Sequence, residues 1–289
     1  MNAAERIENV LHAALAAGES PDMPQGLARA MRYAVFPGGG RIRPRLCLAV
    51  AQACGTPDTD VADAAAGALE LIHCASLVHD DLPCFDGAAL RRGKPSVHRA
   101  FGERLAVLAG DALIVRAFET LAVGGLRTPR RLPAMIACLG EASGTPHGIA
   151  AGQAWECESS PNLAAYHRAK TGALFWAATT LGALSAGHRV AEWGQLGGRL
   201  GEAYQVADDI KDMTATEAEA GKPVGVDQSL GRPSAALQLG LRGALKRLNL
   251  LVTEALDSIP ACPGADELRD LIGQERRRLI PERVVRLAA

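Results

Sequence analysis

The sequence predicts an all-α fold: one large bundle of about ten or more helices around a central cavity, with residues 1–289 forming a single domain. Alanine is abundant and aromatic residues make up only 4% of the chain, a composition that favours helices over strands. No segment alternates as a strand would, and no change in composition marks a domain boundary. With 48% hydrophobic residues, the chain can bury a sizeable core.

Glycine and proline clusters divide the chain into its expected helices. Breakers lie at 18–24, 37–40 and 55–58, and Pro83 ends the helix that runs up to Asp81. The polar segment 213–226 is predicted to be a mobile loop. Helices are predicted over 2–17, 25–36, 41–54, 61–81, 106–121, 133–139, 163–186, 192–212, within 227–258, and over 265–287, where Pro281 can interrupt the last one.

Charge and cysteine content exclude several classes of protein. The formal net charge is -1, so no global field attracts nucleic acid or an anionic membrane. The seven cysteines form no C-x-x-C pair, which argues against a zinc site or a disulfide framework and fits a reducing compartment. The N-terminal residues lack the pattern of a signal peptide, and no apolar run reaches the length of a membrane span. A cytoplasmic protein without nucleic-acid partners is expected.

Three carboxylates, Asp80, Asp81 and Asp86, follow a largely apolar stretch, and Arg91 and Arg92 come shortly after them. Carboxylates at the end of a buried helix are costly unless a cation neutralises them, and Mg²⁺ is the natural oxygen-seeking partner. Arginines suit phosphate oxygens. The stretch therefore indicates a magnesium-bridged polyphosphate, although a solvated acidic loop explains it about equally well when it is read alone.

A second acidic helix end resolves that ambiguity. Asp208 and Asp212 are spaced i, i+4 and share a face, where like charges repel unless a cation bridges them. If both helices line one cavity, their ends can hold several Mg²⁺ ions around one diphosphate. The cations and the hydroxyl group that can bind that diphosphate are Lys170, Thr171, Lys222 and Arg91, and those that can bind a second one are Arg43, His73 and Arg92.

No general base, nucleophile or nucleotide loop stands out, so metal-assisted ionisation of a diphosphate is the most economical chemistry. The glycines before Arg41 and Arg43 also allow backbone N–H groups to converge on an anion, although a plain helix–helix loop with exposed arginines explains them as well. A polyphosphate enzyme with an apolar helical cavity for a carbon chain is therefore expected.

From about residue 30 to 240, the sequence closely resembles the trans-prenyl diphosphate synthases. Several motifs carry the resemblance in the family's order: Gly38-Gly39-Gly40-Arg41-Ile42-Arg43-Pro44, His73 to Asp86 followed by Leu90 to Pro95, Gly152-Gln153, Lys170-Thr171-Gly172, Gln205 with Asp208-Asp209-x-x-Asp212, and Gly221-Lys222. Within the family, the chain is most similar to the geranylgeranyl diphosphate synthases of the proteobacterial carotenoid pathway. The resemblance implies the type I isoprenoid synthase fold and a homodimer.

The resemblance also implies roles for the site residues. It makes Asp80, Asp86 and Asp208 ligands of Mg²⁺, with Asp81 and Asp212 beside them and Asp209 among the catalytic aspartates. Three Mg²⁺ ions per site are implied, with Mn²⁺ able to substitute. The allylic diphosphate is assigned to Arg91, Lys170, Gln205 and Lys222, the cation formed from it to Thr171, and isopentenyl diphosphate to Arg43, His73 and Arg92 together with the Gly40-Arg41 turn.

Three positions depart from the family pattern. Gly40 stands where a lysine is usual, so one cation for isopentenyl diphosphate is missing. Residues 87–89 replace a frequent run of further acids, and Arg232-Pro-Ser replaces a common Lys-x-Thr. Because similar relaxations occur in the proteobacterial relatives, activity is expected to survive.

The length of the product follows from Ala75 and Ser76, which lie five and four residues before Asp80, roughly 6–8 Å down the helix at about 1.5 Å per residue. A large side chain there would form a floor, as in farnesyl-producing relatives, so small ones predict the C20 geranylgeranyl product. Leu71, Phe118 or a residue of a partner chain can form the deeper floor.

Four alternatives remain open: a farnesyl diphosphate synthase, a terpene cyclase, a catalytically weak partner subunit, and a di-iron bundle. Residues 208–212 do not match the usual second motif of a cyclase, and a non-catalytic subunit would normally have lost its Asp motifs. A di-iron bundle needs two Glu-x-x-His motifs, and only Glu70 with His73 forms one.

Overall fold

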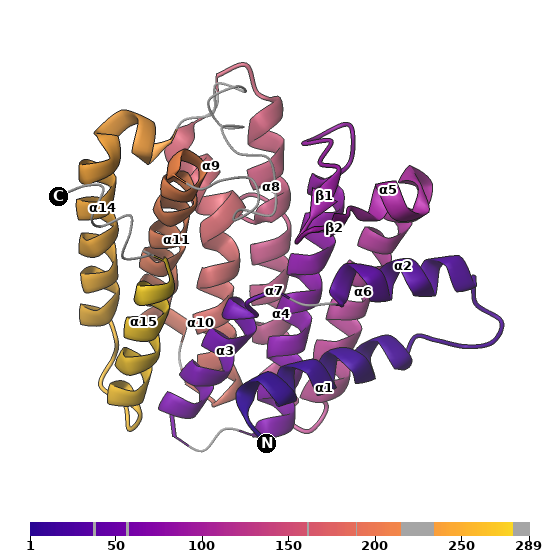
Figure 1. Cartoon of the computed structure of the whole chain (residues 1–289). Helices are drawn as coiled ribbons and strands as arrows, with labels where there is room; N and C mark the ends of the chain where they lie inside the picture. Colours follow the sequence, from indigo (N-terminus) through magenta and orange to yellow (C-terminus); the bar gives the residue numbers. More distant parts are fainter. Residues whose placement is uncertain (37–38, 56–57, 161, 189, 215–233, 280–289) are drawn as a thin grey trace.

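In the computed structural model of the chain, residues 1–36, 39–55, 58–160, 162–188, 190–214 and 234–279 are described, and they confirm the all-α class (Figure 1). The α-helices are α1 (Ala3–Ala16), α2 (Gln25–Val35), α3 (Ile42–Ala53), α4 (Thr59–Asp80), α5 (Val97–Phe101), α6 (Glu103–Gly125), α7 (Leu132–Ser143), α8 (Ile149–Ala154), α9 (Leu163–His167), α10 (Ala173–Ser185), α11 (Gly194–Thr214), α14 (Ala235–Asp257) and α15 (Ala265–Leu279).

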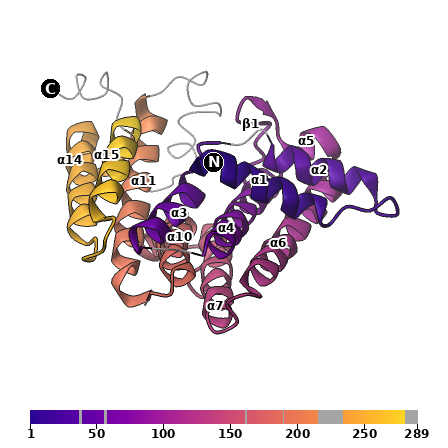
Figure 2. The ribbon, with the colours of Figure 1, turned by 90° about the horizontal axis from the view of Figure 1, so that it is seen from below.

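Helix α4 forms the centre of the bundle because its sequence is apolar or small on nearly every side. It packs against α1, α3, α6 and α10, and Figure 2 shows it enclosed by these helices when the molecule is seen from below. By length and hydropathy α4 would pass for a membrane span, but 78% of its apolar window is buried inside the protein. It is therefore a core helix whose C-terminal end carries Asp80.

Small residues let the central helices approach closely. A side chain at Gly110 or Gly124 of α6 would collide with His79 or Ala64 of α4. On the other side, a side chain at Gly201 of α11 would lie 2.6 Å from the Cα atom of Gly172. Glycine at these contacts brings helix backbones together and leaves the functional helix ends little freedom to shift.

Several local features differ from the sequence prediction, among them the short helices α5 and α8, which were not predicted. The segment 163–186 is one helical run, as predicted, but residues Arg168–Gly172 form a π turn within it. A short hairpin, β1 (Leu90–Arg91) and β2 (Lys94–Pro95), was not predicted. Arg92 and Gly93 link its strands at φ 54° and 75°, as a type I′ turn requires, but strands of two residues are too short to show an alternating pattern.

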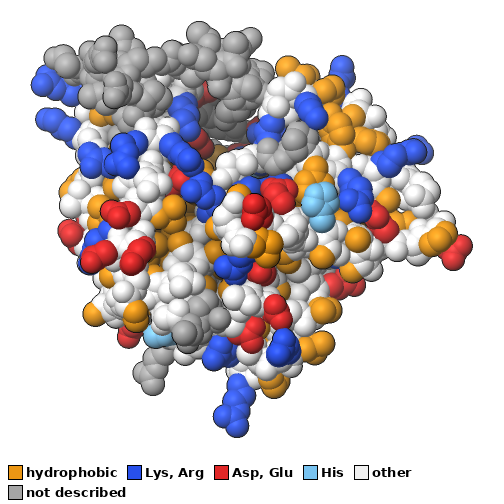
Figure 3. Space-filling model, turned by 60° about the horizontal axis from the view of Figure 1, so that its bottom comes forward, with side chains coloured by type: hydrophobic (Ala, Val, Ile, Leu, Met, Phe, Trp, Pro, Cys, Tyr) orange, Lys and Arg blue, Asp and Glu red, His pale blue; other side chains and the backbone are white. Residues whose placement is uncertain are grey.

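Some predictions lie outside the described residues. They are the breaker at Pro37-Gly38, most of the loop at 213–226, the Gly221-Lys222 motif, Arg232, and the end of the last helix beyond Leu279. On the face shown in Figure 3, basic and acidic side chains are both spread across the surface, as the net charge of -1 implies.

Candidate active site

The first acidic motif forms a turn that returns to its own starting point. Helix α4 ends at Asp80, and the N–H group of Asp86 donates to the carbonyl oxygen of Asp80 at 3.0 Å. Carboxylate oxygens of Asp80, Asp86 and Glu156 consequently lie within 4.8 Å of one another. This confirms that the helix breaks near Pro83, and the turn that follows brings Asp86 back beside Asp80.

The donor set of this cluster fits a hard divalent cation. All three side chains offer carboxylate oxygens, as Mg²⁺ prefers, and no soft sulfur ligand belongs to the set. Burial raises the pKa of Asp80, and the nearby Lys170 ammonium opposes that shift. A bound cation would relieve the cost of burying these charges.

Both carboxylate oxygens of Asp81 are bound by another side chain of the protein. Its side chain is only 2% exposed, and Arg91 Nε donates to its two oxygens at 3.0 and 3.1 Å. Burial raises the pKa of Asp81, against the hydrogen bonds from Arg91. The same guanidinium lies 3.8 Å from Asp80. Asp81 thus supports Arg91 beside the cluster, and its expected part in metal binding stays a prediction.

A π turn presents Lys170 and Thr171 between the two acidic motifs. Lys170 Nζ donates to Asp80 at 3.2 Å and to Glu156 at 2.5 Å, while the Thr171 hydroxyl donates to Gln205 at 2.6 Å. Gly152 of α8 packs against the backbone of Lys170 with no room for a side chain. Wide π turns are frequent at functional sites because they redirect side chains out of the helical register.

The aspartates of the second motif have separate environments. Asp208 is 58% exposed, with Lys211 at 3.8 Å, and Asp212 is partly buried. Asp209 is buried and accepts hydrogen bonds from Gln205 at 2.9 Å and from the N–H group of Ala235 at 2.6 Å. In these contacts the carboxylate of Asp209 anchors α11 to the start of α14, and its expected place among the catalytic aspartates stays a prediction.

A cationic cluster lies beside the acidic site. Arg43 Nη1 is 3.4 Å from His73 Nε2, and its guanidinium lies 4.8 Å above the ring of Phe175. Arg43 Nε is buried without a hydrogen-bond partner among the described residues. Burial and the charges of Arg43 and Arg92 hold the pKa of His73 well below its usual range. An anion would satisfy this cluster.

Arg41, in the turn before this cluster, was expected to contact isopentenyl diphosphate, but in the structure its side chain contacts other parts of the protein. That side chain is buried, adopts φ 48°, and pairs with Glu8 and Glu70 at 2.8 Å each. It also donates to the carbonyl oxygen of Val35 at 2.9 Å. Its donors thus join α1, α2 and α4, and its expected contact with isopentenyl diphosphate stays a prediction. Gly40 is exposed and offers only backbone groups.

The expected product-length residues lie on α4, where Ala75 is buried and the Ser76 hydroxyl donates to the carbonyl oxygen of His73 at 2.8 Å. Lys222 lies outside the described residues.

Sequence reasoning missed Glu156 and Tyr166. Glu156 accepts hydrogen bonds from Tyr166 at 2.7 Å and from Gln153 at 3.2 Å, in addition to Lys170. The available signal was a carboxylate three residues after Gln153, a spacing that puts both side chains on the same side of a helical turn.

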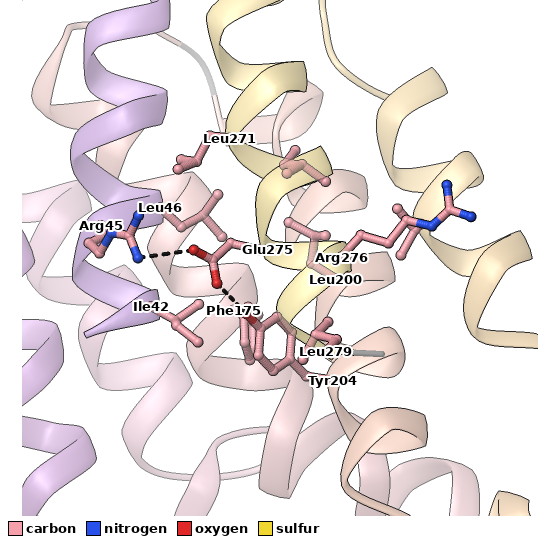
Figure 4. A pocket seen from close by; sticks show the side chains of 12 residues that line it. Ile42, Arg45, Leu46, Phe175, Leu200, Tyr204, Leu271, Glu275, Arg276 and Leu279 are labelled. Atoms are coloured by element: carbon pink, nitrogen blue, oxygen red, sulfur yellow. Dashed lines mark hydrogen bonds and ion pairs between the residues drawn. The ribbon is translucent and has the colours of Figure 1, made fainter. Parts of the chain in front are cut away.

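An apolar pocket adjoins the cationic cluster through Phe175. It lies between α3, α10, α11, α14 and α15, and Figure 4 shows Glu275 pointing into it between Arg45 and Tyr204. The ring centroids of Phe175 and Tyr204 are 4.4 Å apart, and the Arg43 guanidinium also lies 4.8 Å from the Phe175 ring. The pocket wall therefore also supports Arg43.

The fold and the site define an all-α enzyme class in which helix-end carboxylates and a separate cationic cluster handle two anionic groups. The chain belongs to the polyprenyl synthetase family, whose sequence pattern matches residues 24–261. It is 52% identical to the geranylgeranyl diphosphate synthase of Cereibacter sphaeroides, over 97% of each chain. It is 53% identical to that of Rhodobacter capsulatus, over 94% of each.

A solved geranyltransferase from Helicobacter pylori, complexed with magnesium and isoprenyl diphosphate, superposes with a TM-score of 0.79 at 30% identity. The alignment covers 94% of this chain and 96% of the geranyltransferase.

Proposed function

We propose that the chain is a magnesium-dependent trans-prenyltransferase that condenses isopentenyl diphosphate with an allylic diphosphate to give geranylgeranyl diphosphate. One observation carries the proposal: the Asp80–Asp86 cluster is connected through Lys170 and Thr171 to Gln205 on the second acidic helix, next to a separate Arg43–His73 cluster. Two anion sites of different character suit a reaction between two diphosphates. The names of the two bacterial relatives support the product.

The contacts suggest a role for each group. Lys170 and Arg91 would turn toward the allylic diphosphate, and Gln205 would hold Thr171 where its hydroxyl oxygen stabilises the allylic cation. Arg43, His73 and Arg92 would hold isopentenyl diphosphate. Asp80, Asp86 and Asp208 would ligate Mg²⁺, which when bound supplies the positive charge that neutralises a departing diphosphate.

In this reaction the carbon–oxygen bond to the allylic diphosphate breaks first. The double bond of isopentenyl diphosphate then attacks the allylic cation, and a proton leaves the new chain for the released diphosphate. We expect three Mg²⁺ ions per site, replaceable by Mn²⁺, and a cytoplasmic enzyme.

The proposed C20 product rests on the small side chain of Ala75, which is buried on α4 where a larger residue would obstruct a growing chain. Incubation with Mg²⁺, isopentenyl diphosphate and dimethylallyl, geranyl or farnesyl diphosphate, followed by sizing of the products, tests this. A dominant C20 product is expected, and Ala75→Tyr should shift it to C15. A dominant C15 product from the unmodified chain would make it a farnesyl diphosphate synthase, and cyclised hydrocarbons would make it a terpene cyclase.

We also propose a homodimer formed through α6. Leu108, Val115 and Val123 are 52%, 58% and 69% exposed on one broad face of this helix, and Leu126 continues it at 68%. A second copy of the chain would cover this stripe. A continuous apolar stripe, unlike a single exposed leucine, is typical of an interface. Light scattering on Val115→Arg should give a monomer where the unmodified chain gives a dimer; a monomeric unmodified chain would refute the interface.

A further inference from the structure

The carboxylate of Glu156 accepts hydrogen bonds from three side chains, and no role has yet been assigned to these contacts. Its Oε1 atom accepts from Lys170 at 2.5 Å and from Tyr166 at 2.7 Å, and its Oε2 atom accepts from Gln153 at 3.2 Å. The side chain is only 16% exposed. A carboxylate with both oxygens engaged in this way has little capacity left for a metal.

Lys170 is shared between this carboxylate and a proposed metal ligand. Its ammonium group lies 2.5 Å from Glu156 but 3.2 Å from Asp80, so the stronger contact is with Glu156. Asp80 and Asp86 complete the same cluster within 4.8 Å. A divalent cation held by Asp80 would repel an ammonium in contact with the same carboxylate. The Lys170 ammonium therefore has to move away from Asp80 when a divalent metal ion binds there.

We propose that Glu156 is a positioning residue that draws the Lys170 ammonium away from Asp80 when the metal enters. Lys170 then keeps its contact with Glu156 and releases Asp80 to the metal. Without Glu156, the ammonium would pair with Asp80 alone and compete with the metal there. This inference rests on the proposed magnesium-dependent function, because it assumes that Asp80 is a ligand.

Binding of Mn²⁺ alone, measured by electron paramagnetic resonance on the full-length protein without substrate, tests the proposal. Glu156→Gln should weaken Mn²⁺ binding about tenfold, the scale found for residues that support metal ligands. Lys170→Gln should bind Mn²⁺ at least as tightly as the unmodified chain. The double variant should match Lys170→Gln, because the effect of Glu156 passes through Lys170.

The exposed neighbour Glu158 provides a matched control, and Glu158→Gln should leave Mn²⁺ affinity unchanged. Thermal unfolding monitored by circular dichroism verifies that each variant folds. If Glu156→Gln weakened Mn²⁺ binding equally in the unmodified chain and in the Lys170→Gln variant, Glu156 would itself be a ligand and the proposal would be overturned. Unchanged Mn²⁺ affinity in the Glu156→Gln single variant would also overturn it. Prenyl product formation is scored separately, so an inactive chain with the predicted Mn²⁺ pattern would count only against the proposed function.

Discussion

The two acidic motifs share the letters Asp-Asp and differ in how the protein treats them. At the end of α4, Asp80 and Asp81 are in contact with Lys170 and Arg91, cations of the chain itself. On α11, Asp208 is largely exposed, and its neighbour Asp209 is buried in hydrogen bonds to the protein.

Despite this difference, each Asp-Asp pair has a more accessible, outward member and a buried member that faces the protein. In the first motif Asp80 belongs to the carboxylate cluster while Asp81 holds Arg91. In the second motif Asp208 is accessible while Asp209 joins two helices. The outward member should affect catalysis, and the inward member should affect stability.

Asp80→Asn should give the largest effect. Loss of a metal ligand should lower the rate of product formation about 1,000-fold, or about 4 kcal/mol in activation free energy. Steady-state assays with farnesyl and isopentenyl diphosphates measure it, with Asp257→Asn on the surface of α14 as the control. A rate within tenfold of the unmodified enzyme would remove Asp80 from the proposed metal site.

Asp209→Asn should act mainly on stability. An asparagine cannot accept from both Gln205 and the Ala235 N–H group, so the free energy of unfolding should fall by about 2 kcal/mol. Urea unfolding measures this. Asp208→Asn should leave unfolding almost unchanged, since its side chain is exposed. If Asp208→Asn were the more destabilising of the two, the comparison would be wrong.

Asp81→Asn should show a smaller loss of stability, about 1.5 kcal/mol, because it leaves the Arg91 guanidinium with only its longer ion pair to Asp80. The expected loss of unfolding free energy is smaller than for a fully buried ion pair, because Arg91 is 25% exposed and water can partly replace the lost contact. Urea unfolding again provides the measurement. A loss of activity without any loss of stability would instead assign Asp81 to the metal.

The smallest effect concerns His73 on the same helix as the first motif. Because its folded pKa lies well below the unfolded value of about 6.5, the unfolded chain binds the proton more readily. Stability should therefore fall as the pH drops below about 6.5, and His73→Gln should flatten that fall. Melting temperatures of both proteins at about pH 7.5 and about pH 5.5 test this. Parallel curves would contradict it.

The helices were predictable because breakers and apolar stretches are local signals. The break at Pro83 was also a local signal, whereas the pairing of Asp86 with Asp80 was implied only by the family resemblance. The π turn was not predictable, because its extra residue leaves the composition of 163–186 unchanged. The hairpin at 90–95 depends on two positive φ angles that only tertiary contacts specify.

Within the site, residue types were easier to predict than orientations. Arg41 and Arg43 are separated by one residue, but Arg41 pairs with the buried carboxylate of Glu70 whereas Arg43 lies beside His73, one turn further along α4. Asp209 could not be assigned to the protein side without knowing that Ala235 lies next to it. Glu156 was missed because its partners Tyr166 and Lys170 lie ten or more residues away along the chain.

The π turn at Arg168–Gly172 has a consequence for insertions and deletions. An α-helix advances by about 100° per residue, so removing one residue here would restore ordinary helix and rotate everything on one side by that angle. Because Lys170 and Thr171 are adjacent, this rotation would break either the hydrogen bond from Lys170 to Asp80 or the hydrogen bond from Thr171 to Gln205. A deletion of one residue in this turn is therefore expected to be more harmful than most substitutions within it.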